Sequence, residues 1–140
     1  MIPINYWAVL AAAIANMILG SLWYGPLFGK PWMALMGITK ESMAAAKEKG
    51  MGTSYFLMMA GSLLMSFITA NVLIFASAYT NLYGSPVGAL VGFMSWLGFV
   101  APVTLGSVLW EGKPWKLWFL NAGYYLVGLV LMGLILSVLR

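Results

Sequence analysis

The chain has 140 residues, of which 63% are hydrophobic and 7% are charged, and its formal net charge is +4. A typical soluble domain is roughly 45–50% apolar and about 25% charged, and a domain this small leaves a large share of its surface in contact with water. The composition therefore excludes an ordinary soluble domain and predicts a protein that lies in a lipid bilayer.

Along the chain, four apolar segments predict membrane-spanning α-helices. About 20 helical residues, at roughly 1.5 Å each, cross the hydrocarbon core, and each segment is long enough and has no charge in its interior. A transmembrane β-barrel would instead show alternating segments of about ten residues. We therefore expect an all-α membrane protein with one domain over residues 1–140, a four-helix bundle whose spans cover about 4–24, 53–79, 86–110 and 115–139.

The first of these spans has the position of a signal peptide but not its pattern. No basic residue precedes the apolar stretch, and Trp-Tyr-Gly-Pro follows it where a cleavable signal has small residues. We therefore expect this segment to remain in the protein as a membrane span.

Residues 25–52 form the longest polar connection between the predicted spans. Pro31 stands where a short helix can begin, because the first helical turn does not need its missing N–H, and Gly37 can end that helix. Thr39 can cap a second helix that ends at Gly50. We expect both short helices to lie along the lipid headgroups.

The basic residues predict the orientation of the chain. All the lysines lie in or beside two connections, whereas the opposite side carries the N-terminal tail, the uncharged turn 81–85 and Arg140. Short cytoplasmic loops are enriched in Lys and Arg. We therefore expect loops 25–52 and 111–114 in the cytoplasm and both termini outside. The lysines are Lys30, Lys40, Lys47, Lys49, Lys113 and Lys116.

Small residues recur at every fourth position on three of the predicted helices. Such stripes allow close helix approach in lipid, where van der Waals packing and polar contacts hold helices together. We interpret them as packing surfaces, within the chain or against a second copy. The stripes are Ala8, Ala12, Asn16 and Gly20; Ser62, Ser66 and Ala70; and Gly84, Gly88 and Gly92.

Polar groups also occur near the middle of the predicted spans. Asn16, Ser66 and Tyr124 carry polar side chains, and Pro102 cannot donate to the Gly98 carbonyl, which is left free at a kink. Together they could line a narrow site for a small neutral solute or a weakly held cation, as transporter sites often lie at the midplane beside broken helices. Alternatively, they hydrogen-bond across helices, each bond contributing about 0.6 to 2 kcal/mol. We favour this second interpretation.

Two stretches of the chain read alike. Residues 19–23 and 29–32 match residues 105–110 and 112–115, because in both places Leu-Gly-Ser and a Trp precede Gly-Lys-Pro-Trp. A duplicated helical hairpin would produce this echo and relate two halves by a pseudo-two-fold axis. Convergence is the alternative, since interfacial helix ends attract Trp and Lys.

These matching stretches form a candidate motif at the predicted cytoplasmic ends of the helices. Glu111 ends the third span, where the helix dipole disfavours an anion. It could act as a gate or attract a cation, or form a salt bridge with a nearby lysine, and we favour the salt bridge. The aromatics are interpreted as an interfacial belt rather than a ligand cage. The motif residues are Trp23, Tyr24, Pro26, Lys30, Trp110, Glu111, Lys113 and Trp115.

The same residues resemble those of a known family. The run Leu-Trp-Tyr-Gly-Pro-Leu-Phe-Gly-Lys at 22–30, the opening Asn-Tyr-Trp-Ala-Val at 5–9 and Leu-Trp-Glu-Gly-Lys at 109–113 are similar to an uncharacterised family of small bacterial four-span membrane proteins, a domain of unknown function. The resemblance covers essentially the whole chain. It implies a four-helix fold in a bacterial cytoplasmic (inner) membrane, and no established activity.

The residue inventory bears on function as well as on fold. The chain lacks His, Cys and Asp, so the usual materials of general acid–base catalysis, nucleophilic triads and metal sites are missing. We therefore expect no enzyme activity, no metal and no cofactor. The lysines do not form a basic face with interleaved aromatics, which argues against a nucleic-acid partner.

Three hypotheses for the function follow. The first is a structural or accessory membrane subunit that forms a homo-oligomer or joins a larger complex, with membrane lipids as its other partners. The second is a small channel or facilitator for a small solute or ion. The third, an enzyme that acts on lipid, is weak because it would have to depend on Glu111 with Lys or Tyr.

Overall fold

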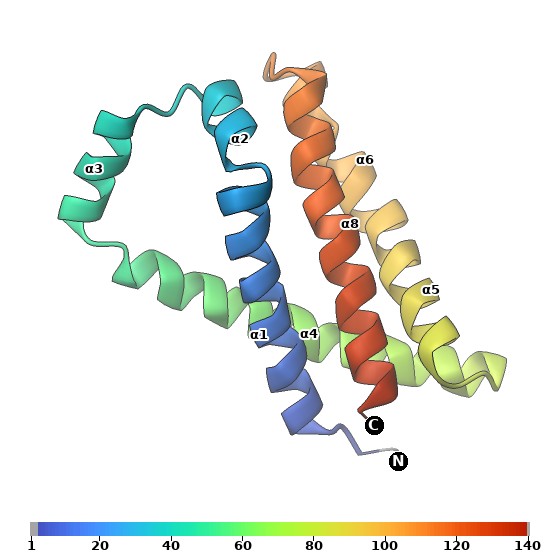
Figure 1. Cartoon of the computed structure of the whole chain (residues 1–140). Coiled ribbons are helices and arrows are strands. Elements are labelled where there is room, and N and C mark those ends of the chain that lie inside the picture. Colours follow the sequence, from blue (N-terminus) through green and yellow to red (C-terminus); the bar gives the residue numbers. More distant parts are fainter. Residues whose placement is uncertain (1–2, 140) are drawn as a thin grey trace.

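The computed structural model describes residues 3–139, and within them the chain forms helices joined by turns (Figure 1). Four stretches are long and apolar enough to cross a membrane, namely Tyr6–Leu27, Gly52–Thr80, Ser85–Leu109 and Trp115–Val138. The all-α fold with four helices long and apolar enough to cross a membrane is confirmed. In chain order the elements are α1 (Tyr6–Leu22), η1 (Trp23–Leu27), α2 (Gly29–Met36), α3 (Lys40–Lys49), α4 (Gly52–Thr80), α5 (Ser85–Ser95), η2 (Trp96–Val100), α6 (Ala101–Thr104), α7 (Gly106–Leu109) and α8 (Trp115–Val138).

Both short helices predicted between the first two spans are present. α2 ends at Gly37, whose φ of 69° lies in the left-handed region that glycine adopts without strain. The Thr39 hydroxyl accepts from the Ser42 N–H at 3.1 Å and so caps α3. α3 lies well apart from α1, α5 and α8 in Figure 1 and joins the start of α4 by a short turn.

The long helices depart from a regular four-helix bundle. In Figure 1, α1, α8 and α5 run side by side, whereas α4 runs across them near the end where both termini lie. The first turns of α4 consequently extend away from the other helices, and Tyr55, Phe56 and Leu57 are exposed. A hydrophobicity pattern sets helix length but does not set crossing angles, which depend on the side chains at each contact.

The closest helix contact joins α5 to α8. A Cβ atom at Gly88 would collide with the carbonyl oxygen of Gly133, and a Cβ atom at Gly133 would collide with the carbonyl oxygen of Gly88. The two backbones can approach this closely only because both positions lack a side chain. The predicted packing role is present for Gly88 and Gly92, whereas Gly84 precedes α5 and does not contact another helix in this way.

α1 and α4 are joined through the other predicted stripes. Ser66 is 0% exposed, and its hydroxyl donates to the Val9 carbonyl at 2.8 Å. Ala8, Ala12 and Ala70 are buried in the same region. Around this contact lies one apolar core at the end of the molecule near the termini, formed by Ala8, Val9, Ala12, Ala70, Leu73, Val87, Val91, Met132 and Leu136.

Two helices contain a π-helical segment. In η1 the Phe28 N–H donates to the Trp23 carbonyl at 2.8 Å, and in η2 the Ala101 N–H donates to the Trp96 carbonyl. Each segment lies beside a proline, Pro26 within η1 and Pro102 just after η2. The irregularity predicted at Pro102 is therefore present, as a π segment that precedes the proline.

Candidate ligand-binding site

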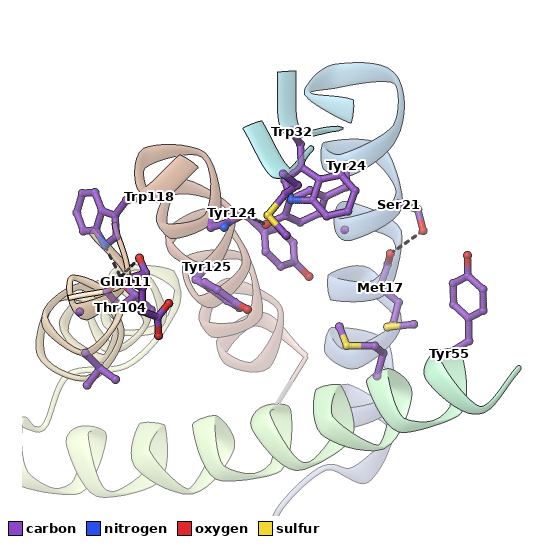
Figure 2. Close-up of a pocket in the computed structure, with 17 residues that line it drawn as sticks. Met17, Ser21, Tyr24, Trp32, Tyr55, Thr104, Glu111, Trp118, Tyr124 and Tyr125 are labelled. Carbon is purple, nitrogen blue, oxygen red and sulfur yellow. Dashed lines mark hydrogen bonds between the residues drawn. The ribbon is translucent and has the colours of Figure 1, made fainter. Parts of the chain in front are cut away.

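A cavity of about 900 Å³ opens in the half of the molecule opposite the termini (Figure 2). It lies between the C-terminal half of α1, α2, the first turns of α4, the α6–α7 segment and the N-terminal half of α8. Its volume falls in the range of roughly 300–1,000 Å³ typical of sites for small organic molecules. The lining residues are Met17, Gly20, Ser21, Tyr24, Trp32, Met36, Tyr55, Met58, Val103, Thr104, Gly106, Ser107, Glu111, Trp118, Asn121, Tyr124 and Tyr125.

Aromatic rings in contact with one another form one wall of the cavity. The ring of Tyr24 lies 5.3 Å from that of Tyr124 and 5.2 Å from that of Trp32, edge to face in both cases. The rings of Tyr124 and Tyr125 lie 5.2 Å apart. Such pairs add about 0.5–1.5 kcal/mol beyond the area they bury, so this wall is held in place without a ligand.

The π segment η1 positions this wall against α8. The Trp23 indole N–H donates to the Leu120 carbonyl at 3.0 Å, and the Tyr24 hydroxyl donates to the Asn121 side-chain oxygen at 2.7 Å. Consecutive side chains of the Trp-Tyr pair thus bind consecutive residues of α8. A Cβ atom at Gly29 would lie 2.7 Å from the Tyr24 carbonyl oxygen, so the turn after η1 requires glycine there.

The opposite wall is fixed by two tryptophans. The Trp118 indole N–H donates to the Thr104 hydroxyl at 3.0 Å, and the Trp96 indole N–H donates to the Ala122 carbonyl at 2.8 Å. The Thr104 hydroxyl in turn donates to the Val100 carbonyl at 2.7 Å. This bond lies next to Pro102, which interrupts the regular helix hydrogen bonds. The α6–α7 segment is therefore anchored to α8 despite its irregular backbone.

A polar contact below the cavity separates it from the apolar core. The Asn16 amide donates to the Ser62 hydroxyl at 3.0 Å, and the Tyr124 hydroxyl donates to the Asn16 carbonyl and side-chain oxygens at 3.3 and 3.4 Å. Asn16 is 4% exposed. This contact joins α1, α4 and α8 at one level.

The five mid-membrane residues predicted from sequence do not form one site. Asn16 and Tyr124 do meet, but their polar groups are satisfied by each other and by Ser62, which the sequence analysis placed in a packing stripe rather than in this group. Ser66 bonds elsewhere on α1. Gly98 and Pro102 are exposed and take no part in the cavity lining. Asn16 and Ser66 thus make hydrogen bonds between helices, and the structure does not bring the five residues together.

The candidate motif divides into residues that build the cavity and residues that do not. Tyr24 and Glu111 line the cavity. Trp23 lies outside the lining and holds η1 on α8 through its hydrogen bond to the Leu120 carbonyl. Trp110, the sequence counterpart of Trp23, is 87% exposed, so the two copies of the echo differ in structure. The remaining motif residues are exposed and lie outside the lining: Pro26, Lys30, Lys113 and Trp115.

Three cavity residues on α8 were not predicted as a group. Asn121, Tyr124 and Tyr125 are spaced at i, i+3 and i+4, which puts them on one helix face. A polar and aromatic face near the middle of this span is the sequence signal that could have located the site. Among residues 3–139 the structure shows no cluster of three or more His, Cys, Asp or Glu that could hold a metal ion.

The hydrogen bond between Tyr24 and Asn121 gives a direct prediction. Replacing Tyr24 with phenylalanine keeps the edge-to-face contact of its ring with Tyr124 but removes the 2.7 Å hydrogen bond to Asn121. We expect the free energy of unfolding in detergent to fall by about 0.5–1.5 kcal/mol. Tyr79→Phe is the matched control, because Tyr79 is exposed and lies outside the cavity. An equal loss in both variants would show that the bond does not hold η1 on α8.

The fold and the cavity define a class of protein: a multi-pass membrane protein with a cavity among its helices. Within that class, the chain belongs to a family of proteins of unknown function, DUF1761, whose family model matches residues 7–137. Neither the curated proteins nor the solved structures contain a match to the chain.

Proposed function

We propose that the protein binds a small organic molecule in the cavity between α1, α7 and α8 and acts as a membrane facilitator for it. The observation that carries this proposal is the cavity itself, about 900 Å³ in volume and lined by aromatic rings with a few polar groups. Ligand sites in membrane and soluble proteins share this combination of an apolar wall and sparse polar groups that fix orientation.

The packing below the cavity supports a carrier with one open side rather than a continuous pore. The Asn16 contact and the core near the termini fill the rest of the molecule. We propose that the open side faces the cytoplasm of a bacterial inner membrane, with both termini outside. The lysines beside the cavity end support this orientation, although Arg140, on the opposite side in the sequence argument, lies outside the described residues.

Binding rather than catalysis is also part of the proposal. Glu111 is the single carboxylate among the lining residues, and none of them is His, Cys, Lys or Arg. General acid–base chemistry needs a donor and an acceptor with matched pKa values, and the lining offers one such group beside hydroxyls. We propose no cofactor and no nucleic-acid partner.

Tyr125 tests the proposed binding site. Its ring lines the cavity and contacts the ring of Tyr124, so Tyr125→Ala should weaken the binding of an aromatic probe by about tenfold, on the order of 1.4 kcal/mol. The measurement is equilibrium dialysis of triphenylphosphine oxide and tetraphenylphosphonium against the protein in lipid nanodiscs. Phe99→Ala is the matched control, because Phe99 is exposed and outside the lining. Equal binding of both probes to the parent chain and Tyr125→Ala would refute the site.

A second candidate function, a homo-oligomeric or accessory subunit, is favoured by the first turns of α4. Phe56 and Leu57 are exposed and lie outside the cavity lining, and this end of α4 extends beyond the other long helices (Figure 1). Lipid or a second copy of the chain could cover it. Counting subunits by single-molecule photobleaching in nanodiscs distinguishes the two covers. A chain covered by lipid is a monomer, whereas a chain covered by a second copy is at least a dimer.

A further inference from the structure

We infer that the cavity accepts an organic cation, a molecule with an aromatic or aliphatic body and a positively charged ammonium or phosphonium centre. The inference rests on the proposed function and adds the chemical class of the ligand. It is carried by the charge, the aromatic content and the polar groups of the cavity walls, taken together.

The charge of the lining favours a cation. Glu111 is the single charged side chain among the lining residues, all of which belong to the described part of the chain, whereas all the lysines lie outside the lining. The chain as a whole has a net charge of +4, so the charge of the cavity lining is opposite in sign to that of the whole chain. An anionic ligand would meet the Glu111 carboxylate with no lysine of the lining to offset it.

The aromatic walls favour the same ligand. Six lining residues carry a Tyr or Trp ring: Tyr24, Trp32, Tyr55, Trp118, Tyr124 and Tyr125. The face of such a ring attracts a cation, by about 0.5–1 kcal/mol when exposed and about 2 kcal/mol or more when desolvated. Figure 2 shows Glu111 and Thr104 on one side of Tyr125, and Tyr24 with Trp32 on the other.

None of the polar groups in the walls is positively charged, and two of their acceptors are already used within the chain. The Thr104 hydroxyl already receives the Trp118 indole N–H, and the Asn121 side-chain oxygen already receives the Tyr24 hydroxyl. Both walls are thus hydrogen-bonded within the chain. The Glu111 carboxylate is the charged group of the lining that a ligand can contact. A quaternary cation has no N–H to donate and therefore needs no free hydrogen-bond acceptor, so it suits these walls.

Two tetraphenyl ions of similar shape and opposite charge test the ligand class. Tetraphenylphosphonium should bind the protein in nanodiscs of uncharged lipid at least tenfold more tightly than tetraphenylborate, after subtraction of binding to empty nanodiscs. Triphenylphosphine oxide, which is neutral, should fall between them. Equal affinities for the three probes, or a preference for the borate, would overturn the inference.

Glu111→Gln tests the residue that carries the charge. This variant keeps the shape of the side chain and should weaken tetraphenylphosphonium binding by about tenfold while leaving triphenylphosphine oxide unchanged. Glu48→Gln is the matched control, because Glu48 lies on α3 outside the lining. It removes the same charge from the chain, so equal weakening by both variants would show a general charge effect and overturn the role of Glu111.

The outcomes separate this inference from the proposed function. If the three probes bind alike and Tyr125→Ala weakens them all, the cavity is a binding site but not a selective one for cations, and the inference alone fails. If Tyr125→Ala and Glu111→Gln both leave every probe unchanged, the cavity is not a binding site and both proposals fail. Thermal unfolding of each variant without probe shows whether it is folded.

Discussion

Replacing Gly88 with valine is expected to lower the free energy of unfolding by more than about 3 kcal/mol. A Cβ atom at this position would fall on the carbonyl oxygen of Gly133 and beside the hydroxyl of Ser137. The obstacle is mainly backbone, which cannot turn aside as the end of a flexible side chain can. α5 would have to separate from α8, and the core residues Val87 and Val91 would lose their contacts.

Gly61→Val is the matched control for this substitution. Gly61 lies within α4, and a Cβ atom there would meet no heavy atom within 4 Å. Both variants can be followed by circular dichroism during thermal unfolding in the same detergent. We expect Gly61→Val to unfold close to the parent chain and Gly88→Val to unfold far below it. Equal stability of the two variants would contradict the close α5–α8 contact.

Replacing Asn16 with leucine is expected to cost about 2–4 kcal/mol, the second largest effect. The variant removes the partner of the Ser62 hydroxyl and one acceptor of the Tyr124 hydroxyl. In lipid these groups have no water to bond instead, so the loss of a buried partner is costly. Leucine would also place methyl groups where the side chain of Asn16 lies close to Gly128.

Asn71→Leu provides the control for Asn16→Leu. Asn71 lies on α4 and is half-buried, and its amide donates to the Phe67 carbonyl of the same helix at 2.9 Å. The substitution removes an equal amide without breaking a bond between helices, so it should cost less than about 1 kcal/mol. Similar losses in the two variants would contradict the role of Asn16 in joining three helices.

The sequence was sufficient for the long helices and for some of their ends, whereas α2 begins at Gly29 rather than at Pro31. Span length and hydrophobicity predict a membrane helix because the bilayer imposes a thickness, and Thr39 and Gly37 predict helix ends through local backbone chemistry. The small-residue stripes also predicted which faces pack, since Ala12, Ser66 and Gly88 are all buried. Each of these features depends on residues near one another in the chain.

The cavity could be predicted only in part, because it depends on residues distant in sequence. Tyr24 and Glu111 stood out as members of a motif, but Asn121, the hydrogen-bond partner of Tyr24, follows it by 97 positions. The steep crossing of α4, which brings Tyr55 and Met58 to the cavity, follows from side-chain packing with α1. Counting residues from the helix ends also placed Gly98 and Asn16 at the same depth. In the structure Gly98 is exposed, whereas Asn16 is buried and hydrogen-bonded to Ser62.

Labelling of single cysteines tests most directly the claim that a cavity opens on the side of the lysine-bearing loops. The chain has no native cysteine, so Ser107→Cys in the cavity lining and Ser66→Cys in the core report on one position each. We expect a charged thiol reagent in membrane vesicles to modify Ser107→Cys from the side of the lysine loops and not from the other side. Ser66→Cys should stay unmodified from both sides. Failure of the reagent to reach Ser107→Cys from either side, or its reaction from both sides, would contradict a cavity with one opening.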